Sequence, residues 1–357
     1  MRILHVIHSL NIGGAEKLLV DMLPVMKNKG HQVAVYLLQD CDSPFKRSLE
    51  KNGIAVITAP FKAGRYSLRQ ASFLKELMQK YDVIHAHCMP ATIAVALGSN
   101  GLKSAPQMVL TLHSTTIAVR DKLILRPFAK YVFSKYDRII GCSQMATDAM
   151  LAVLPKFEVT TINNGINLKP FSNAEPADRR QMVPEYRNDD VIVSMVAGFR
   201  EAKDQDCLIR SLTHLPDNFK LCIVGDGVRR PILEEIIEEL RLTNRVRLLG
   251  LRQDIPSLLR ASDFVVLSSH YEGLSLASIE GMASGHPFIA SKVAGLKELV
   301  EGVGILFPES DDKALAALLL DTNNNKQKYE KVVKRCLHKA KEFDIETTVD
   351  RYLSAYK

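Results

Sequence analysis

Short apolar runs alternate with longer amphipathic stretches along the whole chain. In the first half the runs predict β-strands, and they lie at residues 3–7, 32–38, 55–58, 83–87, 108–112, 138–143 and 159–162. Between the first two runs, residues 15–28 place Leu18, Leu19, Met22 and Met26 on one helical face, and Gly30 ends the helix. Strands that alternate with helices in this way are typical of a parallel α/β sheet.

A second series of the same kind follows a change in composition. Residues 165–190 carry three prolines and show little periodicity, whereas strands are again predicted further along the chain, at 191–197, 220–224, 246–249, 264–268 and 288–291. A helix is predicted at residues 229–240, and a charged helical stretch at 312–356. The chain is therefore predicted to form two Rossmann-like parallel-sheet domains, residues 1–170 and 191–340, joined by a linker at 171–190. Two such sheets would face a cleft at the carboxyl ends of their strands, where ligands bind in this architecture.

Composition indicates an ordinary globular chain. Of the 357 residues, 46% are hydrophobic and 24% are charged, which excludes a disordered protein. The apolar runs are too short to cross a bilayer, and the first one breaks at His8 before a Gly-Gly turn, so it is interpreted as a buried strand rather than a signal peptide. The six cysteines show no metal-ligand spacing and are expected to be reduced core thiols. These features predict a cytoplasmic protein.

Charge is distributed unevenly between the two halves. Residues 1–180 hold 23 Lys and Arg against 13 Asp and Glu, a balance of +10, whereas the remaining residues have a balance of −3. A basic half favours an anionic partner, which could be nucleic acid, a phosphorylated acceptor or an acidic membrane surface. A basic surface that serves only solubility explains the same imbalance.

The most informative segment is residues 271–287, which follows the predicted strand at 264–268. Glu272 lies in the turn at the carboxyl end of this strand, and Glu280 lies in the first two turns of the next helix. The backbone N–H groups of Ser275, Leu276 and Ala277 open that helix and suit an anion such as a diphosphate. The carboxylates could accept hydrogen bonds from sugar and ribose hydroxyls, although a solvated pair of glutamates at an ordinary helix start fits the spacing too.

Arg200 and Lys203 follow the predicted strand at 191–197. Two cations three residues apart can neutralise the charge that develops on a departing diphosphate. They would then replace the magnesium ion that many nucleotide enzymes use. No DxD-like pair of metal-binding aspartates flanked by strand residues stands out in the sequence. A merely soluble loop is the alternative for these two side chains.

Two further positions follow strands of the first domain. Gly13 and Gly14 come after the first strand, where paired glycines let the backbone approach a phosphate closely, although a plain strand-to-helix turn is equally consistent. His113 follows the strand at 108–112 and could bind a sugar hydroxyl, or serve only as a structural hydrogen-bonding residue.

The stretch 120–138 mixes cations with apolar residues. Its basic side chains include Arg120, Lys122, Arg126 and Lys130. A basic helix with aromatic residues suits the surface of an anionic membrane or an acceptor, and it equally suits a surface helix that packs through its apolar side.

Taken in order along the chain, these motifs resemble the GT-B glycosyltransferases of the large retaining family 4, across essentially the full length. The resemblance rests on Gly13-Gly14, His113-Ser114, Asn164-Gly165-Ile166, the segments 199–203 and 225–227 with Gly250, and the block from Glu272 to Glu280 with Gly285-His286-Pro287. It implies that the C-terminal domain binds a nucleotide sugar, that the N-terminal domain binds the acceptor, and that the last helix, about residues 340–357, packs back on the first domain.

The resemblance also implies roles for individual residues. Glu280 would hold the ribose, Arg200 and Lys203 the diphosphate, Glu272 and His113 the transferred sugar, and Gly13-Gly14 would close over the phosphates. Relatives commonly carry an arginine five residues before the lysine, and this sequence has Gly198 there, with Arg200 two residues nearer.

The sequence thus predicts a metal-independent, retaining glycosyltransferase without a cofactor. Its donor would be a nucleotide sugar, most readily a UDP-sugar, and its acceptor a glycan or lipid-linked glycan of cell-surface polysaccharide or lipopolysaccharide synthesis. A nucleotide-sugar epimerase of the same architecture is the alternative. A nicotinamide-dependent oxidoreductase is disfavoured because the GxGxxG fingerprint is missing, and no recognisable motif supports a nucleic-acid partner. Peripheral contact with the inner face of an anionic membrane is also expected.

Overall fold

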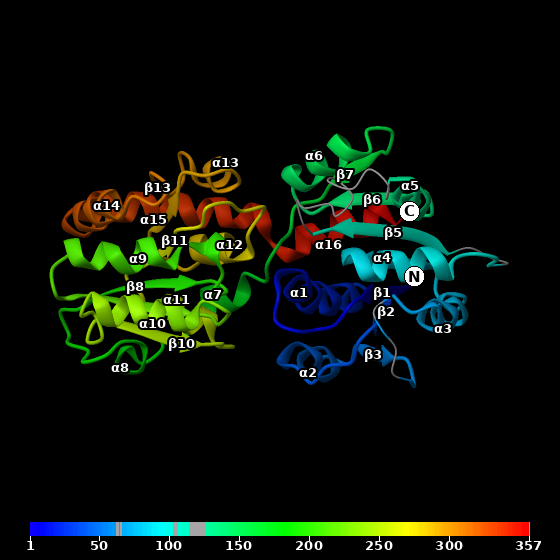
Figure 1. The fold of residues 1–357 in the computed structure, drawn as a ribbon, viewed down its shortest axis with the longest axis horizontal. Coiled ribbons are helices and arrows are strands. Elements are labelled where there is room, and N and C mark those ends of the chain that lie inside the picture. The colour runs from blue at the N-terminus through cyan, green and yellow to red at the C-terminus, as the bar shows by residue number, and fades with distance from the viewer. Residues whose placement is uncertain (62–63, 65, 103–105, 114–125, 357) are drawn as a thin grey trace. The chain divides into compact units, whose positions relative to one another are not determined.

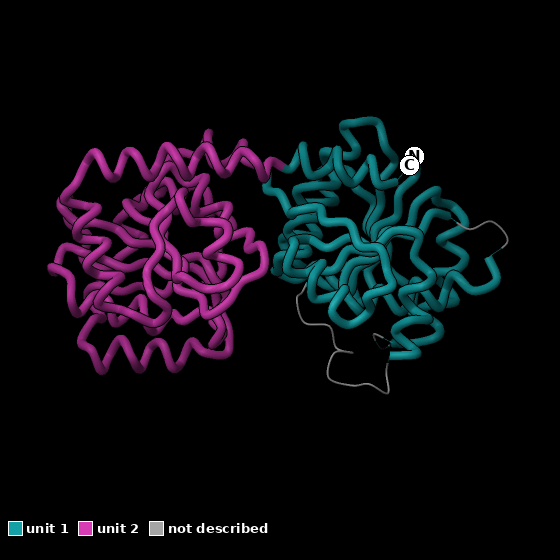
Figure 2. The backbone as a smooth tube through the Cα atoms, turned by 90° about the horizontal axis from the view of Figure 1, so that it is seen from above, with its two compact units in different colours: residues 1–166, 345–357 teal, residues 167–344 magenta. Residues whose placement is uncertain are grey.

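The computed structural model describes residues 1–61, 64, 66–102, 106–113 and 126–356. Its chain divides into two compact units, which Figure 2 colours separately: unit 1 comprises residues 1–166 and 345–357, and unit 2 comprises residues 167–344. Each unit contains one parallel sheet covered by helices, as Figure 1 labels them. The predicted α/β class with two Rossmann-like sheets is therefore confirmed.

Unit 1 is built on a seven-stranded sheet in the order β3-β2-β1-β4-β5-β6-β7. The strands are β1 (Arg2–Ile7), β2 (Gln32–Leu37), β3 (Ala55–Thr58), β4 (Val83–His87), β5 (Gln107–Leu112), β6 (Arg138–Gly141) and β7 (Val159–Thr161). The helices are α1 (Gly14–Asn28), α2 (Pro44–Lys51), α3 (Leu68–Met78), α4 (Cys88–Gly98), α5 (Arg126–Phe133), α6 (Gln144–Val153) and α16 (Ile345–Ala355). Every paired strand runs parallel to its neighbour, so each connection crosses over the sheet through a helix.

Apolar side chains that alternate between the two faces of this sheet contribute to two hydrophobic cores. One core joins the sheet to α3, α4, α5 and α6, and the other joins it to α1, α2 and α16. In the second core the fully buried Tyr352 of α16 packs with Leu19 and Met22 of α1, although more than 300 residues separate them. The C-terminal helix is thus a structural part of unit 1.

Unit 2 contains a six-stranded sheet in the order β10-β9-β8-β11-β12-β13. Its strands are β8 (Val191–Val196), β9 (Phe219–Val224), β10 (Val246–Gly250), β11 (Phe264–Leu267), β12 (Phe288–Ser291) and β13 (Ile305–Phe307). Its α-helices are α7 (Lys169–Asn173), α8 (Arg179–Met182), α9 (Gln205–Ser211), α10 (Arg230–Glu239), α11 (Ile255–Arg260), α12 (Leu276–Ala283), α13 (Leu296–Val300), α14 (Asp312–Asn324) and α15 (Lys326–Ala340). Three short 3-10 helices complete it: η2 (Glu201–Lys203), η3 (Leu212–His214) and η4 (Lys341–Phe343).

The segment 171–190, which the sequence suggests as a linker, lies within unit 2. It contains α8, whose Met182 is fully buried with Val183 in a core that includes Ile192 of β8 and Cys222 of β9. Met182 and Val183 are apolar residues in an otherwise polar segment, and their burial anchors this segment against the sheet of unit 2. Residues 341–344 also belong to unit 2, and the chain enters unit 1 again at Ile345, whose N–H donates to the carbonyl of Ile166 at 2.9 Å.

Candidate functional site

The loop after β11 carries the first predicted carboxylate. Glu272 is buried, and its carboxylate forms an ion pair with the ammonium group of Lys203 and accepts a hydrogen bond from the hydroxyl of Ser269 at 2.7 Å. Lys203 ends η2 after β8, the strand next to β11 in the sheet. Neighbouring parallel strands end at the same edge, and this places the two predicted residues side by side.

The two loops are also joined through their backbones. The hydroxyl of Ser268 donates to the carbonyls of Lys203 and Asp204, at 3.1 and 2.7 Å, and the N–H of His270 donates to the carbonyl of Ala202 at 2.9 Å. Lys203 and Glu272 are therefore held by a defined framework rather than by their own contact alone.

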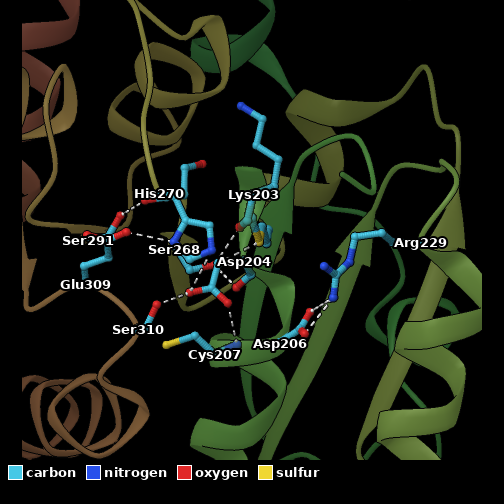
Figure 3. A network of polar contacts seen from close by, with 12 residues as sticks. Lys203, Asp204, Asp206, Cys207, Arg229, Ser268, His270, Ser291, Glu309 and Ser310 are labelled. Carbon is cyan, nitrogen blue, oxygen red and sulfur yellow. Dashed lines mark hydrogen bonds and ion pairs between the residues drawn. The ribbon is translucent and has the colours of Figure 1, made fainter. Parts of the chain in front are cut away.

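Asp204 lies at the centre of the polar contacts in Figure 3. Its backbone is left-handed (φ 44°), and its side chain accepts from the N–H of Cys207 at 3.2 Å, which caps α9. The hydroxyl of Ser310 donates to the same carboxylate at 2.8 Å, and His270 lies between Asp204 and Glu309, with its Nδ1 2.8 Å from the Glu309 carboxylate. These contacts fix the turn that presents Lys203, and the spacing of residues along the sequence does not indicate them.

The helix α12 places the second predicted carboxylate. Ser275 is its N-cap residue with extended backbone, Leu276 is its first residue, and Glu280 lies buried in its second turn, as predicted. The first N–H groups of any helix have no acceptor within it, so the start of α12 can receive an anion. The loop, the helix start and Glu280 thus follow each other at the carboxyl end of β11.

Gly295 is needed for the position of Glu272 and was not singled out from the sequence. It has φ 85°, and a side-chain β-carbon there would lie 2.0 Å from the carbonyl oxygen of Glu272. Only glycine allows the loop before α13 to approach the Glu272 loop this closely. A glycine four residues after the end of an apolar strand, here Ser291 of β12, is too common a signal to find such a position.

Arg200 precedes η2 and is exposed. Its Nε lies 3.9 Å from the point where a β-carbon on Gly198 would stand, an ordinary van der Waals distance. The Arg200 side chain therefore runs back past the glycine, close to where a side chain at position 198 would begin.

In unit 1, Gly13 and Gly14 lie at the start of α1, after β1. Gly13 is the N-cap residue, and the carboxylate of Glu16 folds back over it, 2.4 Å from the position of a Gly13 β-carbon, whereas Gly14 is exposed. Burial raises the pKa of Glu16. A side chain at position 13 would meet only the end of the flexible Glu16 side chain, which can move aside.

His113 directly follows β5, the strand that pairs with β4, and is half-buried. Its Nε2 lies 2.9 Å from Nδ1 of His87 in β4, and burial lowers the pKa of His113 to about 4. His5 and His85 lie beside His87 in the same sheet. His85 and His87 alternate with Ala86 in an otherwise apolar strand, and this spacing places both histidines on one face of the sheet. The pattern was not used to predict the site.

The structure describes only some of the residues that are predicted to face a membrane. Arg120 and Lys122 lie outside the described residues, whereas α5 carries the half-buried Arg126 and the exposed Lys130. The apolar face of α5, including Val132 and Phe133, packs into the core of unit 1. Among the described residues, no helix combines the length and the apolar character required to cross a bilayer.

Comparison with known proteins identifies the class. The family model for glycosyl transferases group 1 matches residues 178–338, and the model for glycosyltransferase family 4 matches residues 12–169. The chain belongs to the family 4, group 1 glycosyltransferases with the GT-B fold, and it is a transferase enzyme.

Several relatives cover most of the chain. It is 27% identical over 306 residues to EpsF of Bacillus subtilis (strain 168), which is named as a glycosyltransferase, covering 81% of this chain and 79% of EpsF. It is 25% identical over 301 residues to an Escherichia coli enzyme named UDP-Gal:alpha-D-GlcNAc-diphosphoundecaprenol alpha-1,3-galactosyltransferase, covering 76% and 77% of the two chains. Among solved structures, Anabaena Alr3699/HepE in complex with UDP and glucose superposes with a TM-score of 0.84 at 25% identity, over 99% of each chain.

Proposed function

We propose that this glycosyltransferase moves a hexosyl or N-acetylhexosaminyl group from a UDP-sugar to a glycan or lipid-linked glycan, with retention of anomeric configuration and without a metal ion. The observation that carries the proposal is the contact between Lys203 and Glu272 at the carboxyl edge of the unit 2 sheet. A cation for the diphosphate and a carboxylate for the sugar are thereby held on adjacent loops.

The donor assignment draws on the relatives. The Anabaena protein was crystallised with UDP and glucose, and the Escherichia coli enzyme is named for a UDP-galactose donor and a diphosphoundecaprenol-linked acceptor. In this chain Glu280 would accept hydrogen bonds from the ribose hydroxyls, and the N–H groups at Ser275 and Leu276 would bind the diphosphate.

The residues would divide the chemistry between them. As the bond from the anomeric carbon to the diphosphate oxygen breaks, Lys203 and Arg200 neutralise the negative charge that develops on the diphosphate. The acceptor hydroxyl forms the new bond from the same face, and its proton goes to an oxygen of the departing phosphate. Glu272 and His113 would orient the sugar, and Gly13-Gly14 would let the backbone approach the phosphates.

A metal ion would be redundant in this scheme because the cations belong to the protein itself. The basic α5, with Lys130 exposed, would contact anionic lipids on the inner face of the cytoplasmic membrane, where a lipid-linked acceptor resides. The protein would then be cytoplasmic and peripheral.

The test is a panel of UDP-, GDP- and ADP-sugars with lipid-linked and free glycan acceptors, assayed with and without EDTA. Release of UDP together with an α-linked product from an α-linked donor, unchanged by EDTA, supports the proposal. Loss of turnover with EDTA and its recovery with Mg²⁺ would overturn metal independence. Conversion of the UDP-sugar into its epimer without any acceptor would instead identify an epimerase.

A further inference from the structure

Unit 2 contains a polar cavity at the amino edge of its sheet. The cavity has a volume of about 450 Å³ and is lined by residues before β8, around the start of β9, and in the turn between α10 and β10. Lys203 and Glu272 instead follow the carboxyl ends of their strands. In a parallel sheet these are opposite edges, so the cavity is separate from the candidate site. Its volume lies within the range of about 300–1,000 Å³ that small-molecule sites usually have.

Two buried cations lie next to each other in the lining of this cavity. Lys220 is 5% exposed and Arg245 is 7% exposed. The N–H of Leu221 donates to the carbonyl of Arg245 at 2.8 Å, which places the two cations at neighbouring positions where β9 and β10 begin. Like charges that lie close together repel each other, and burial strengthens the repulsion because little water screens it. An anion in the cavity would reduce this repulsion.

Arg245 has a structural role that accounts for its burial. Its guanidinium group donates to three backbone carbonyls, those of Leu215, Pro216 and Phe219, at 3.2, 2.8 and 3.1 Å. These bonds hold the loop that leads into β9. Nη1 of Arg245 also lies 3.4 Å from the carboxylate of Asp217, but that side chain is fully exposed, so the ion pair is weakened by water.

Lys220 is not explained in the same way. Its ammonium group donates to one carbonyl, that of Asn244, at 2.9 Å, and within the described part of the chain no carboxylate forms an ion pair with it. An ammonium group has three donors, so two of them have no partner among these residues. Buried lysines are rare unless they are paired. Lys220 therefore offers a positive charge and hydrogen-bond donors to a molecule in the cavity.

Arg241 adds a third cation from a strained position of the backbone. It follows α10 with φ 57°, and its N–H donates to the carbonyl of Glu238 while the N–H of Leu242 donates to that of Ile237. Such a turn favours glycine at the left-handed position, because a side chain there strains the backbone. Arg241 is exposed and lines the cavity. Strained residues of this kind are concentrated at ligand sites, and this one brings a guanidinium group to the cavity.

Carboxylates in the same lining narrow the class of ligand. Glu185, which also has a positive φ of 46°, and Asp189 are exposed and line the cavity. The buried carboxylate of Asp190 accepts from the N–H of Arg187 at 2.7 Å and so holds its own turn. Carboxylates accept hydrogen bonds and repel a bare anion. A ligand with both hydroxyl donors and a phosphate group fits this lining better than inorganic phosphate does.

We propose that this cavity is a second ligand site, which binds a phosphorylated sugar. Lys220 and Arg241 donate to the phosphate oxygens, with the charge of Arg245 beside them, and the carboxylates of Glu185 and Asp189 accept from the sugar hydroxyls. The ligand binds reversibly, and no covalent bond changes. Because the cavity lies at the other edge of the sheet, this inference goes beyond the proposed function and does not depend on it.

Calorimetric titration of the full-length protein tests the class of ligand. Glucose 1-phosphate and glucose 6-phosphate are the probes, inorganic phosphate and glucose are their matched controls, and UDP is kept saturating so that the donor site is filled. We expect one sugar phosphate per chain to bind at least about tenfold more tightly than inorganic phosphate, and glucose not to bind. Equal affinity for inorganic phosphate or for glucose, or no binding of either sugar phosphate, would overturn the inference.

Two variants test the cations of the cavity. Lys220→Met keeps the length of the side chain and removes its charge, and folds usually tolerate the exchange of a buried charge for an apolar group of similar size. Arg241→Gly removes the guanidinium group and relieves the backbone strain. We expect each variant to weaken binding by about 10–100-fold, Arg241→Gly without lowering the midpoint of thermal unfolding. Lys313→Ala, which changes an exposed lysine of α14, should leave the affinity unchanged.

A comparison with the candidate site tests where the ligand binds. Lys203→Ala should keep the affinity for the sugar phosphate. If Lys203→Ala abolishes binding while folded Lys220→Met retains it, the sugar phosphate occupies the donor site and the inference fails. It fails as well if Lys220→Met and Arg241→Gly both fold and bind the sugar phosphate as tightly as the unaltered protein does. These results are independent of whether sugar transfer is observed.

Discussion

Lys203 and Glu272 form an ion pair between the loops that follow β8 and β11, and the Ser269 hydroxyl donates to the same carboxylate oxygen, Oε1 of Glu272. In the proposed mechanism both charges acquire new partners, because the diphosphate attracts Lys203 and the sugar hydroxyls bind Glu272. The ion pair is then a resting contact, which keeps a buried carboxylate neutralised until the donor arrives.

Replacing Lys203 by alanine should slow sugar transfer strongly. Loss of one charge-stabilising group is expected to raise the barrier by about 3–4 kcal/mol, or about 10²–10³-fold in kcat/KM. Steady-state rates of UDP release measure the effect. Lys313→Ala, which removes an exposed lysine of α14, should leave the rate unchanged. Near-normal turnover of Lys203→Ala would refute the assigned role.

Arg200 can be tested against the glycine two residues before it. Arg200→Ala should lower kcat/KM by about 10-fold or more if its guanidinium contacts the diphosphate. A β-carbon at Gly198 would meet its nearest atoms at 3.8 and 3.9 Å, which are ordinary van der Waals distances, so Gly198→Arg should be accommodated. The double variant Gly198→Arg/Arg200→Ala should recover activity. Full activity of Arg200→Ala alone would remove Arg200 from the site.

Gly295 and Gly302 form a matched pair for testing the support of Glu272. Both have positive φ, at 85° and 75°, but a β-carbon at 295 would collide with the Glu272 carbonyl, whereas at 302 it meets nothing within 4 Å. Since the backbone strain is similar, Gly295→Ala should lose about 1–3 kcal/mol more stability than Gly302→Ala. Urea denaturation measures the difference. Equal losses of stability in the two variants would mean that the backbone around Glu272 shifts to accept the new β-carbon at no cost in free energy.

The buried histidines predict that unit 1 weakens in acid. Burial lowers the pKa of His5 from 6.5 to about 3, so between these values the unfolded chain binds a proton that the folded chain does not. Stability from this group is complete above pH 6.5 and is lost as the pH falls, at about 1.4 kcal/mol per pH unit. Urea titrations at pH 7, 6 and 5 should show a shallower decline for His5→Gln than for the unaltered protein. The exposed His338→Gln serves as the control, and parallel profiles for both variants would contradict the prediction.

Much of the fold was accessible from the alternation of apolar runs. The expected strands at 55–58, 83–87 and 288–291 coincide with β3, β4 and β12, and the helix expected at 15–28 is α1. The strand β13, Ile305–Phe307, was not predicted, since its three apolar residues lie between Gly304 and Pro308, which are residues typical of loops. The helical stretch at 312–356 is divided in the structure, since Asn325 caps α15 and η4 separates it from α16.

The candidate site was predicted in part for a similar reason. Residues directly after strands, such as Lys203 and Glu272, could be found because parallel strands end at one edge of the sheet. The contacts that hold them, from Ser269, Asp204 and Gly295, depend on side-chain direction and close backbone approach, which spacing does not encode. His5 and His87 were missed because strand pairing, rather than sequence distance, makes them neighbours.

The return of α16 to unit 1 has a consequence for biosynthesis. Residues 345–356, with Tyr352 and Tyr356 among them, complete a core whose other members come from the first third of the chain and from Ile140 and Ile162. On the ribosome, unit 2 can therefore finish folding while unit 1 still lacks a helix, reversing the usual N-terminal-first order. The apolar surface of unit 1 that residues 345–356 cover therefore stays exposed in the nascent chain until those residues have been synthesised.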